Sequence, residues 1–409
     1  MKILVVTYFH IPLVGTDQTG ISRRFTIFLH ALHRIGTDIT LLHLVPPAMR
    51  DAAGPLDELS RSQSAFWGVP VRIEVECRRA RMETAWNHYG AGVLDVRAQP
   101  DWHPYSGPEL AAAVGRHLDA GPDLVFAFGL PMMMPLLQSG RRPARLVFDM
   151  NDIEHKVWVR RAFSKPLYPG KPAKLLQVPA LVRLERRAVA ASKLALVCSE
   201  TDRAYLRRLG YGDQVQVVPN ALPVPAASPG VVAAPTLLFL GDMGYPPNML
   251  AAERMARRIL PRVQAGLPGA RLLVAGKGSD ALPVAGAGLP GIEFLGFVPD
   301  LDQLYAQSRV ICCPITVGGG TRLKLVEAAS YARPIVSTRL GAEGLDLRDG
   351  QEALLRDDDA SFAAACVTLL QDDALCLRLG AAARAVMIEE YDVKKVEARA
   401  ASMIRTALA

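Results

Sequence analysis

The chain has 409 residues, of which 50% are hydrophobic and 21% are charged, and its formal net charge is +7. That length exceeds one ordinary core, and the composition excludes a disordered or fibrous protein, so two globular domains are expected. Residues 1–222 hold 28 Lys and Arg against 20 Asp and Glu, whereas residues 223–409 hold 19 against 20, and all eight histidines lie at or before His155. This split predicts two halves with different binding partners.

The first residues, MKILVVTYF, favour a buried strand over a signal peptide, because one lysine precedes a short apolar run. The longest apolar stretch, LVFAFGLPMMMPLL, is interrupted by glycine and proline and is too short to cross a bilayer. None of the six cysteines forms a C-x-x-C pair, as is usual for reduced core thiols. A cytoplasmic location is therefore expected.

Short apolar strands alternate with amphipathic helical patterns along the whole chain. The strands are predicted at residues 2–9, 38–45, 123–128, 144–150, 195–200 and 215–220, and then at 236–241, 270–276, 292–297, 309–315 and 334–339. Continuous apolar strands separated by helices are typical of parallel sheets covered on both faces. Residues 222–235 have the Pro, Ala and Gly composition of a linker. The fold class predicted is α/β, with two tandem Rossmann-like, doubly wound domains facing across a cleft.

The stretch PITVGGGTRLKLVEAAS follows a predicted strand and leads into a helical pattern. Ligands of parallel sheets bind at such places, and glycines let backbone N–H groups approach an anion at a helix N-terminus. Cations in a first helical turn oppose the helix dipole, so a bound anion would explain Arg322 and Lys324. The loop is therefore predicted to hold a diphosphate, against the alternative of a glycine turn with two solvated cations. Its residues are Gly318, Gly319, Gly320 and Thr321.

Several segments together resemble the retaining nucleotide-sugar glycosyltransferases of the GT-B fold, family four, also called group 1. They are VVPN, LLVAGKGS, FLGFVPDLDQLYAQSRVICCPI and GGGTRLKLVEAASYARPIVST in this order, with VRLERRAVAASKLALVCSETDRAYLRRLG before them. The resemblance covers nearly the whole chain, strongly in the second half and loosely before Asp149. It implies an acceptor-binding domain over residues 1–222 and a nucleotide-sugar-binding domain over 223–389, with a C-terminal helix at about 390–409 packing back on the first.

The resemblance implies roles for single residues of the second half. Glu327 matches the second glutamate of the family's E-x7-E motif, the ribose ligand, although a salt bridge to Lys324 one turn away is the alternative. Arg322 and Lys324 match diphosphate ligands. Val298 stands where main-chain groups meet the base. Lys277 lies at the mouth of the same cleft, or is a surface lysine in a turn.

Two departures from the family pattern stand out. The first glutamate of E-x7-E is replaced by Gly319, and the usual Arg and Lys after the first strand of the second half are missing. FLGDMGYPPN offers Gly241, Asp242 and Gly244 there instead. Phosphate binding is then left to Arg322, Lys324 and backbone amides. Metal is expected to be dispensable, because these donors fill its role, and no other cofactor is expected.

The first half is predicted to bind the acceptor. Gly15 and Gly20 bracket a glycine loop after the first strand, or a plain turn. In FDMNDIEHKVW, the resemblance places Asp149, Asn151, Asp152, Glu154 and His155 near the reacting sugar, where one could orient the acceptor or assist proton transfer. The alternative is that Asn151 or Asp152 caps a helix with Glu154 in its first turn. For His155, a solvent-facing helix position is the other interpretation.

The segment from Lys156 to Lys193 holds ten Lys or Arg and a single acid, Glu185, with Trp158, Phe163 and Tyr168 interleaved. Such a stretch can rest on the anionic inner face of a membrane, or it can be a solvated surface. Nucleic acid is not an expected partner, since no recognition motif accompanies the charge.

The function predicted is an enzyme that moves a hexosyl or related group from a nucleotide-diphosphate sugar to a glycan or lipid-linked acceptor with retention, as in cell-surface polysaccharide synthesis. A GT-B epimerase and a sugar-nucleotide-binding protein without turnover, suggested by Gly319, are the alternatives. A Rossmann-type oxidoreductase is disfavoured, because neither first strand is followed by the dinucleotide fingerprint and its acidic partner.

Overall fold

The computed structural model describes residues 1–8, 20–46, 50, 54–78, 95, 102–163, 172–228 and 230–409. The chain forms two compact units. Unit 1 comprises Met1–Asn220 with Val396–Ala409, and unit 2 comprises Ala221–Lys395. Each unit is described separately below.

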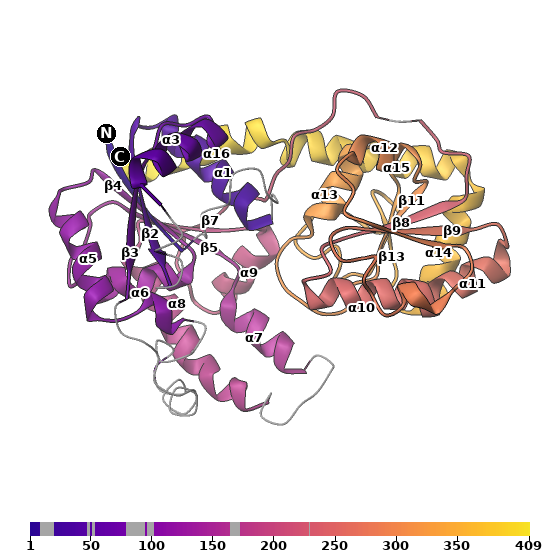
Figure 1. Ribbon diagram of the computed structural model, residues 1–409, viewed down its shortest axis with the longest axis horizontal. Helices are drawn as coiled ribbons and strands as arrows, with labels where there is room; N and C mark the ends of the chain where they lie inside the picture. Colours follow the sequence, from indigo (N-terminus) through magenta and orange to yellow (C-terminus); the bar gives the residue numbers. More distant parts are fainter. Residues whose placement is uncertain are drawn as a thin grey trace. The chain divides into compact units, whose positions relative to one another are not determined.

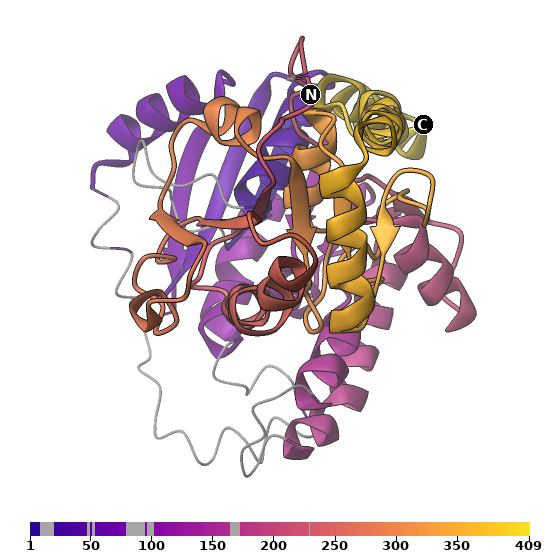
Figure 2. The same cartoon turned by 90° about the vertical axis from the view of Figure 1, so that its right-hand side faces the viewer.

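A seven-stranded parallel sheet in the order β3-β2-β1-β4-β5-β6-β7 forms the centre of unit 1. Its strands are β1 (Lys2–Thr7), β2 (Asp38–Val45), β3 (Arg72–Cys77), β4 (Leu124–Phe128), β5 (Leu146–Asn151), β6 (Leu194–Val197) and β7 (Val215–Val217). The central strands are apolar along their whole length, because helices cover both faces of the sheet. Figure 2 shows the indigo and purple strands of this sheet lying side by side.

The helices of unit 1 lie on both sides of its sheet. They are α1 (Gly20–His33), α3 (Leu56–Trp67), α5 (Pro108–Asp119), α6 (Leu130–Gln138), α7 (Glu154–Phe163), α8 (Val178–Ala191), α9 (Glu200–Arg208) and α16 (Val393–Leu408), with 3₁₀ turns η3 (His103–Tyr105) and η4 (Pro172–Gln177). Figure 1 shows α1, α3 and α16 on one side of the sheet and α5, α6 and α8 on the other.

Unit 2 repeats the architecture with a six-stranded parallel sheet in the order β10-β9-β8-β11-β12-β13. Its strands are β8 (Thr236–Leu240), β9 (Arg271–Ala275), β10 (Ile292–Gly296), β11 (Val310–Cys313), β12 (Ile335–Ser337) and β13 (Leu354–Leu355). Its helices are α10 (Pro246–Arg254), the π-helical turn η5 (Met255–Ile259), α11 (Leu260–Gly266), η6 (Ala285–Ala287), α12 (Leu301–Ala306), α13 (Leu323–Ser330), α14 (Asp359–Gln371) and α15 (Asp373–Glu390). In Figure 1, α10 and α11 lie on one side of this sheet and α12 and α13 on the other.

The α/β class and the parallel sheets predicted from the sequence are confirmed, and every predicted strand is present. The structure adds β3 and β13, each at the edge of its sheet. No single helix in the described ranges has the length and apolarity needed to cross a membrane. Helices α14 and α15 reach that threshold only as a pair, and the chain bends by 105° between them.

Helix α16 packs against α1 through a polar contact. Glu397 accepts from His30 Nδ1 at 2.6 Å and from Arg34 Nη2 at 3.1 Å, while His30 Nε2 contacts the carbonyl oxygen of Trp67 at 2.9 Å. The hydrogen bond to Glu397 raises the pKa of His30. Protonated His30 therefore stabilises unit 1 fully below the pKa of about 6.5 that it has when unfolded, and this contribution is lost as pH rises through the higher folded value.

We predict that His30→Gln lowers the stability of unit 1 at pH 6 by about 1 kcal/mol and that the difference from the parent shrinks at pH 8.5. The measurement is urea unfolding followed by tryptophan fluorescence, which reports on unit 1 because all four tryptophans lie before residue 159. Glu397→Gln should lose at least as much, because it also weakens the pairing with Arg34, and the double variant should lose less than the sum of the two single losses. A His30→Gln effect that is equal at both pH values would contradict the assignment.

Candidate functional site

The turns that follow β8, β9 and β10 are tied together at the carboxyl edge of the sheet in unit 2. Gly241 N–H donates to the Ala275 carbonyl at 3.0 Å, and Gly276 N–H donates to the Gly296 carbonyl at 2.7 Å. Gly276 has φ of 121°, and a Cβ there would lie 2.0 Å from the Gly241 carbonyl oxygen. Because only glycine permits this approach, the backbones of these three turns pack closely against one another.

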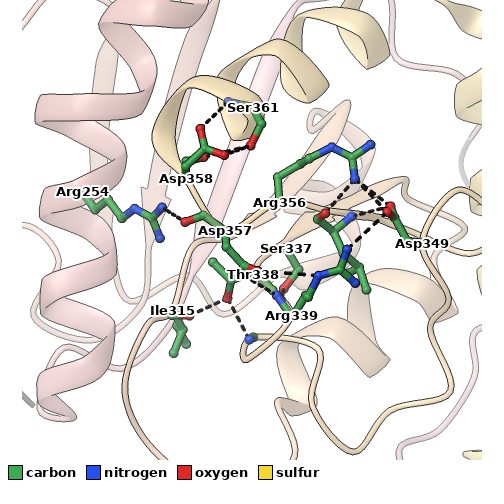
Figure 3. A network of polar contacts seen from close by, with 12 residues as sticks. Arg254, Ile315, Ser337, Thr338, Arg339, Asp349, Arg356, Asp357, Asp358 and Ser361 are labelled. Atoms are coloured by element: carbon green, nitrogen blue, oxygen red, sulfur yellow. Dashed lines mark hydrogen bonds and ion pairs between the residues drawn. The ribbon is translucent and has the colours of Figure 1, made fainter. Parts of the chain in front are cut away.

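The first residues of the loop after β11, Pro314 and Ile315, are held by side chains of neighbouring elements, several of which Figure 3 shows. Arg254 on α10 donates to the Pro314 carbonyl at 2.9 Å and to the Asp357 carbonyl at 2.6 Å, and it pairs with Asp359 at 2.7 Å. Thr338, after β12, donates to the Ile315 carbonyl at 2.5 Å. These contacts hold the first residues of the loop against the neighbouring strand exits.

The predicted diphosphate loop follows Pro314 and Ile315 in the chain. Gly318 and Gly320 have φ values of 118° and 72°, a conformation that disfavours other residues. A Cβ on Gly318 would lie 2.7 Å from the Tyr245 hydroxyl and 3.2 Å from Arg322 Nη2. The glycines therefore serve both the turn and the close packing of Tyr245 and Arg322 around it. Thr321 leads from the loop into α13.

Arg322 is the N-cap residue of α13 and is only 6% exposed. Its Nη1 donates back to the carbonyls of Gly319 and Gly320. Its Nε and Nη2 are buried and have no hydrogen-bond partner in the described parts of the chain. A buried guanidinium edge without a partner is costly, and a paired acceptor such as a phosphate would relieve that cost.

Lys324 is partly buried beside the same loop. Its ammonium group donates to Asn248 Oδ1 at 2.8 Å and lies 4.5 Å from the centre of the Phe239 ring. A Cβ on Gly241 would lie 2.7 Å from Lys324 Nζ, so glycine at this position makes room for the lysine. Burial lowers the pKa of Lys324 to about 8, and the neighbouring Arg322 charge acts in the same direction.

The remaining predicted donor residues have different surroundings. Glu327 Oε2 accepts from the Tyr305 hydroxyl at 3.1 Å, and the Tyr305 ring stacks on Tyr331 with 4.4 Å between ring centres. Val298 packs against the core in the loop after β10. Lys277 is exposed, and its carbonyl accepts from Met243 N–H at 2.9 Å. The structure thus brings Gly241, Arg322 and Lys324 together with the glycine loop.

Two residues of this region were not predicted from the sequence as site residues. Asn248 holds Lys324 through its Oδ1 and donates to the Asp242 carbonyl at 2.7 Å, so it orients the cation. Tyr305 holds Glu327. The PPN triplet at 246–248 was the available signal for Asn248, whereas Tyr305 lies in an ordinary amphipathic helix and gave none.

In unit 1, the predicted acidic segment at the end of β5 divides into buried and half-buried residues. Asp149 is fully buried and paired with Arg24 of α1, whose Nε and Nη2 reach its carboxylate at 2.9 and 2.5 Å. Arg24 Nη1 donates to the Val218 carbonyl at 2.8 Å and to Asn220 Oδ1 at 3.1 Å. Asp149 therefore ties α1 and the end of unit 1 to the sheet, and its carboxylate is buried and occupied by Arg24.

A solvent-facing position for His155 is also wrong, since it is 4% exposed. Its Nδ1 contacts the buried carboxylate of Glu185, which also accepts from the His155 backbone N–H at 3.1 Å. Its Nε2 lies 2.9 Å from the Tyr205 hydroxyl. Because both ring nitrogens have protein partners, His155 connects α7 to α8 and α9 as a packing residue.

Asn151, Asp152 and Glu154 are half-buried where β5 passes into α7. Asn151 has φ of 56°, and its carbonyl accepts from Cys198 Sγ at 2.9 Å. Burial raises the pKa of Tyr8, at the end of β1, and the charges of Glu154 and Asp152 raise it further, which places both carboxylates near that phenol. Tyr8 was not predicted.

Gly129, after β4, was not predicted either, and it packs against Tyr8. It has φ of 86°, and a Cβ there would lie 2.5 Å from the Tyr8 ring. Of the predicted acceptor loop, Gly15 lies outside the described residues and Gly20 is the exposed first residue of α1. Within the described ranges, no group of three or more His, Cys, Asp or Glu side chains has the arrangement of a metal site.

Comparison with known families covers most of the chain. A family profile described as "Glycosyl transferase 4-like domain" matches residues 19–221, and one described as "Glycosyl transferases group 1" matches residues 234–372. The boundary between the two matches falls near the boundary between units 1 and 2.

Curated relatives match over part of their length. A phosphatidyl-myo-inositol mannosyltransferase of Mycobacterium leprae is 32% identical over 193 residues, which cover 44% of this chain and 50% of the relative. An uncharacterized 44.6 kDa protein in the cps region of Klebsiella pneumoniae is 22% identical over 168 residues, 39% of this chain and 43% of the relative. The chain thus spans about half the length of the curated relatives it matches.

Solved structures match over nearly the whole chain. The Anabaena protein Alr3699/HepE, in complex with UDP, has a TM-score of 0.66 at 14% identity, covering 99% of this chain and 100% of that one. Sucrose-phosphate synthase of Thermosynechococcus elongatus has a TM-score of 0.68 at 15% identity, covering 99% and 98%. At such identities the likeness shows the fold, which is the two-domain GT-B fold. The chain belongs to the group 1 glycosyltransferases.

Proposed function

We propose that the protein transfers a sugar from a nucleotide-diphosphate sugar to a glycan or lipid-linked acceptor, with retention of the anomeric configuration. The observation that carries the proposal is the buried Nε and Nη2 edge of Arg322 beside the glycine loop, which has no hydrogen-bond partner in the described part of the chain. Arg24 donates to the Asp149 carboxylate with the same two nitrogens, Nε and Nη2. The corresponding edge of Arg322 therefore suits a pair of acidic oxygens. Both Arg322 nitrogens are buried, so the diphosphate reaches them only if the loop shifts, and three glycines in sequence allow that movement.

The proposed chemistry breaks the bond between the anomeric carbon and the diphosphate oxygen, and the electron pair leaves with the diphosphate. Arg322, Lys324 and the N-terminus of α13 stabilise the developing charge. The acceptor hydroxyl attacks from the face that the leaving group departs, and the diphosphate oxygen takes its proton. Glu327 is proposed to bind the ribose and the loop at Val298 the base. Asp152 and Glu154, beside Tyr8, are the proposed acceptor-side carboxylates of unit 1.

Names of relatives support the substrate class. The Anabaena neighbour is described in complex with UDP and with UDP-glucose, and the mycobacterial relatives are described as phosphatidyl-myo-inositol mannosyltransferases. We infer a nucleotide-sugar donor and an acceptor of glycan or lipid-linked type. The Klebsiella relative is described by its cps region, in keeping with a role in cell-surface polysaccharide synthesis.

The test is release of nucleoside diphosphate from UDP- and GDP-hexoses by the full chain, with and without a pool of glycan and lipid acceptors. We expect release that rises with acceptor, persists in chelator and is lost in Arg322→Met. Arg271→Met, a surface arginine at the amino end of β9, is the matched control. Binding without release would favour the sugar-nucleotide-binding alternative that Gly319 suggests, and donor conversion without acceptor would favour an epimerase. Release that requires added magnesium or manganese would contradict metal independence.

A pH dependence of donor binding follows from Lys324. Only the charged ammonium attracts the diphosphate, and its pKa of about 8 in the free protein means that charge is lost as pH rises through that value. Affinity for UDP or GDP should therefore fall between pH 7.5 and pH 9.5, by at most about tenfold per pH unit for one proton. Calorimetric titration measures it. Lys324→Met should bind more weakly at pH 7.5 and lose this slope, and a parent protein with pH-independent affinity would remove Lys324 from the site.

We also propose that the basic segment of unit 1 contacts anionic membrane. Two large apolar side chains there are exposed, Phe163 at 70% and Leu176 at 61%, and Lys174 Nζ lies 5.6 Å from the Trp158 ring centre. Exposed apolar groups beside lysines are the combination that binds acidic lipid surfaces.

The prediction is co-sedimentation of the protein with vesicles containing acidic phospholipid at physiological salt. Phe163→Ser with Leu176→Ser should abolish it, whereas Phe297→Ser, which removes an aromatic residue that is 65% exposed in unit 2, should not. A parent protein that stays in the supernatant, or a double variant that still sediments, would contradict membrane contact.

A further inference from the structure

A pocket of about 300 Å³ opens in unit 2 at the end of the sheet opposite to the glycine loop. Arg309, in its wall, directly precedes β11, and Arg333 lies just before β12, whereas the glycine loop follows the carboxyl end of β11. The segment before β8 and one face of α15 complete the wall. The pocket is therefore separate from the proposed donor site.

Three arginines line this pocket, and only one of them is paired with an acid among the described residues. Arg309 pairs with Asp373 at 2.5 Å. Arg384 donates to the carbonyls of Ser330 and Pro225. Arg333 is 2% exposed and donates through Nη1 to the Gly230 carbonyl at 2.9 Å. The pocket wall thus carries positive charge in excess.

Arg333 has unsatisfied donors. Its Nε and Nη2 are buried without a hydrogen-bond partner in the described ranges, and burial lowers its pKa, which shows that the charge is poorly compensated. An oxyanion would compensate it with a charge-assisted hydrogen bond. The guanidinium has to turn toward the pocket to reach such a ligand, and the turn breaks no ion pair of the described residues.

The rim of the pocket is apolar. Val231, Leu377 and Ile388 are 36%, 57% and 42% exposed, and Leu377 and Ile388 lie on the same helix, α15. Exposed apolar side chains next to a buried cation suit a ligand that has both an apolar part and an anionic group. Inorganic phosphate would use the arginine and leave the rim exposed, whereas a neutral hydrocarbon would leave the arginine uncompensated.

We propose that this pocket binds an amphiphilic anion, a phosphate or carboxylate that carries a short aliphatic chain, with its head group at Arg333 and its chain along Val231, Leu377 and Ile388. The proposal does not depend on the proposed function, because the pocket shares no residue with the glycine loop.

The test is calorimetric titration of the full chain with octyl phosphate below its micellar concentration, beside inorganic phosphate and octanol. Octyl phosphate should bind more tightly than either. Arg333→Met should weaken it by about ten- to hundredfold, and the control variant Arg378→Met, which removes an exposed arginine of α15, should not. Leu377→Ser with Ile388→Ser changes only exposed side chains and should also weaken binding.

Three results with the parent and the pocket variants would overturn the proposal. They are absence of octyl phosphate binding, binding that Arg333→Met and the double serine variant both retain, and inorganic phosphate binding as tightly as octyl phosphate. Arg322→Met separates this pocket from the donor site. It should leave octyl phosphate binding intact, and loss of binding in that variant would place the ligand at the glycine loop and overturn the assignment.

Discussion

Asp149→Asn should destabilise unit 1 by about 3–5 kcal/mol, because it removes the carboxylate from a buried ion pair and leaves Arg24 charged in the core. Arg24 and Asp149 are 1% and 0% exposed, and they are joined by Nε and Nη2 at 2.9 and 2.5 Å. Asparagine keeps the volume and one acceptor but cannot neutralise the guanidinium. The loss should also loosen the contacts of Arg24 with Val218 and Asn220.

Urea unfolding followed by tryptophan fluorescence measures this effect in unit 1 alone. The matched control is Asp119→Asn, because Asp119 and Arg141 form a two-point pair of the same kind on the surface, at 3.0 and 2.7 Å and about half exposed. Exposed pairs contribute little to stability, so Asp119→Asn should cost much less than Asp149→Asn. Equal losses in the two variants would contradict this prediction, because the buried Arg24–Asp149 pair would then contribute no more stability than an exposed pair.

The sequence predicted the central strands well because they are apolar along their whole length, a pattern that only doubly covered sheets produce. It missed β3, whose residues RIEVEC alternate charged and apolar side chains and bury only Ile73 fully. It missed β13 because that strand has two residues. Both strands lie at sheet edges, where one neighbour is absent and the demand for apolar residues is weaker.

For the candidate site, local sequence identified what a single segment encodes. The glycine loop and Arg322 lie within five residues, and the structure places them together. Contacts made across the fold were not predictable: Asn248 meets Lys324 across 76 residues, and Glu185 meets His155 across 30. His155 and Asp149 were assigned to the acceptor region because the resemblance of FDMNDIEHKVW to the family placed them near the reacting sugar. Their burial depends on partners on other helices, which a local pattern does not specify.

Arg322→Met should weaken binding of UDP or GDP by about ten- to hundredfold, which corresponds to the loss of a charge-assisted hydrogen bond of about 1.5–3 kcal/mol. The physical reason is the Nε and Nη2 edge, which is buried and has no hydrogen-bond partner among the residues that the structure describes. Methionine fills most of the same volume and removes a poorly compensated buried charge, which offsets the loss of the Nη1 contacts with Gly319 and Gly320, so the variant should fold. Arg322→Lys should recover only part of the affinity, because an ammonium cannot contact two phosphate oxygens in one plane.

Calorimetric titration of both nucleoside diphosphates into the three proteins measures this, with Arg271→Met as the surface control. If only charge mattered, Arg322→Lys would bind like the parent, and the guanidinium geometry would be irrelevant. If Arg322→Met binds like the parent, the unpartnered edge serves some purpose other than diphosphate binding, and the glycine loop is not the donor site. The predicted order of affinity is parent, then Arg322→Lys, then Arg322→Met. That order requires the Nε and Nη2 edge of Arg322 to bind the diphosphate directly.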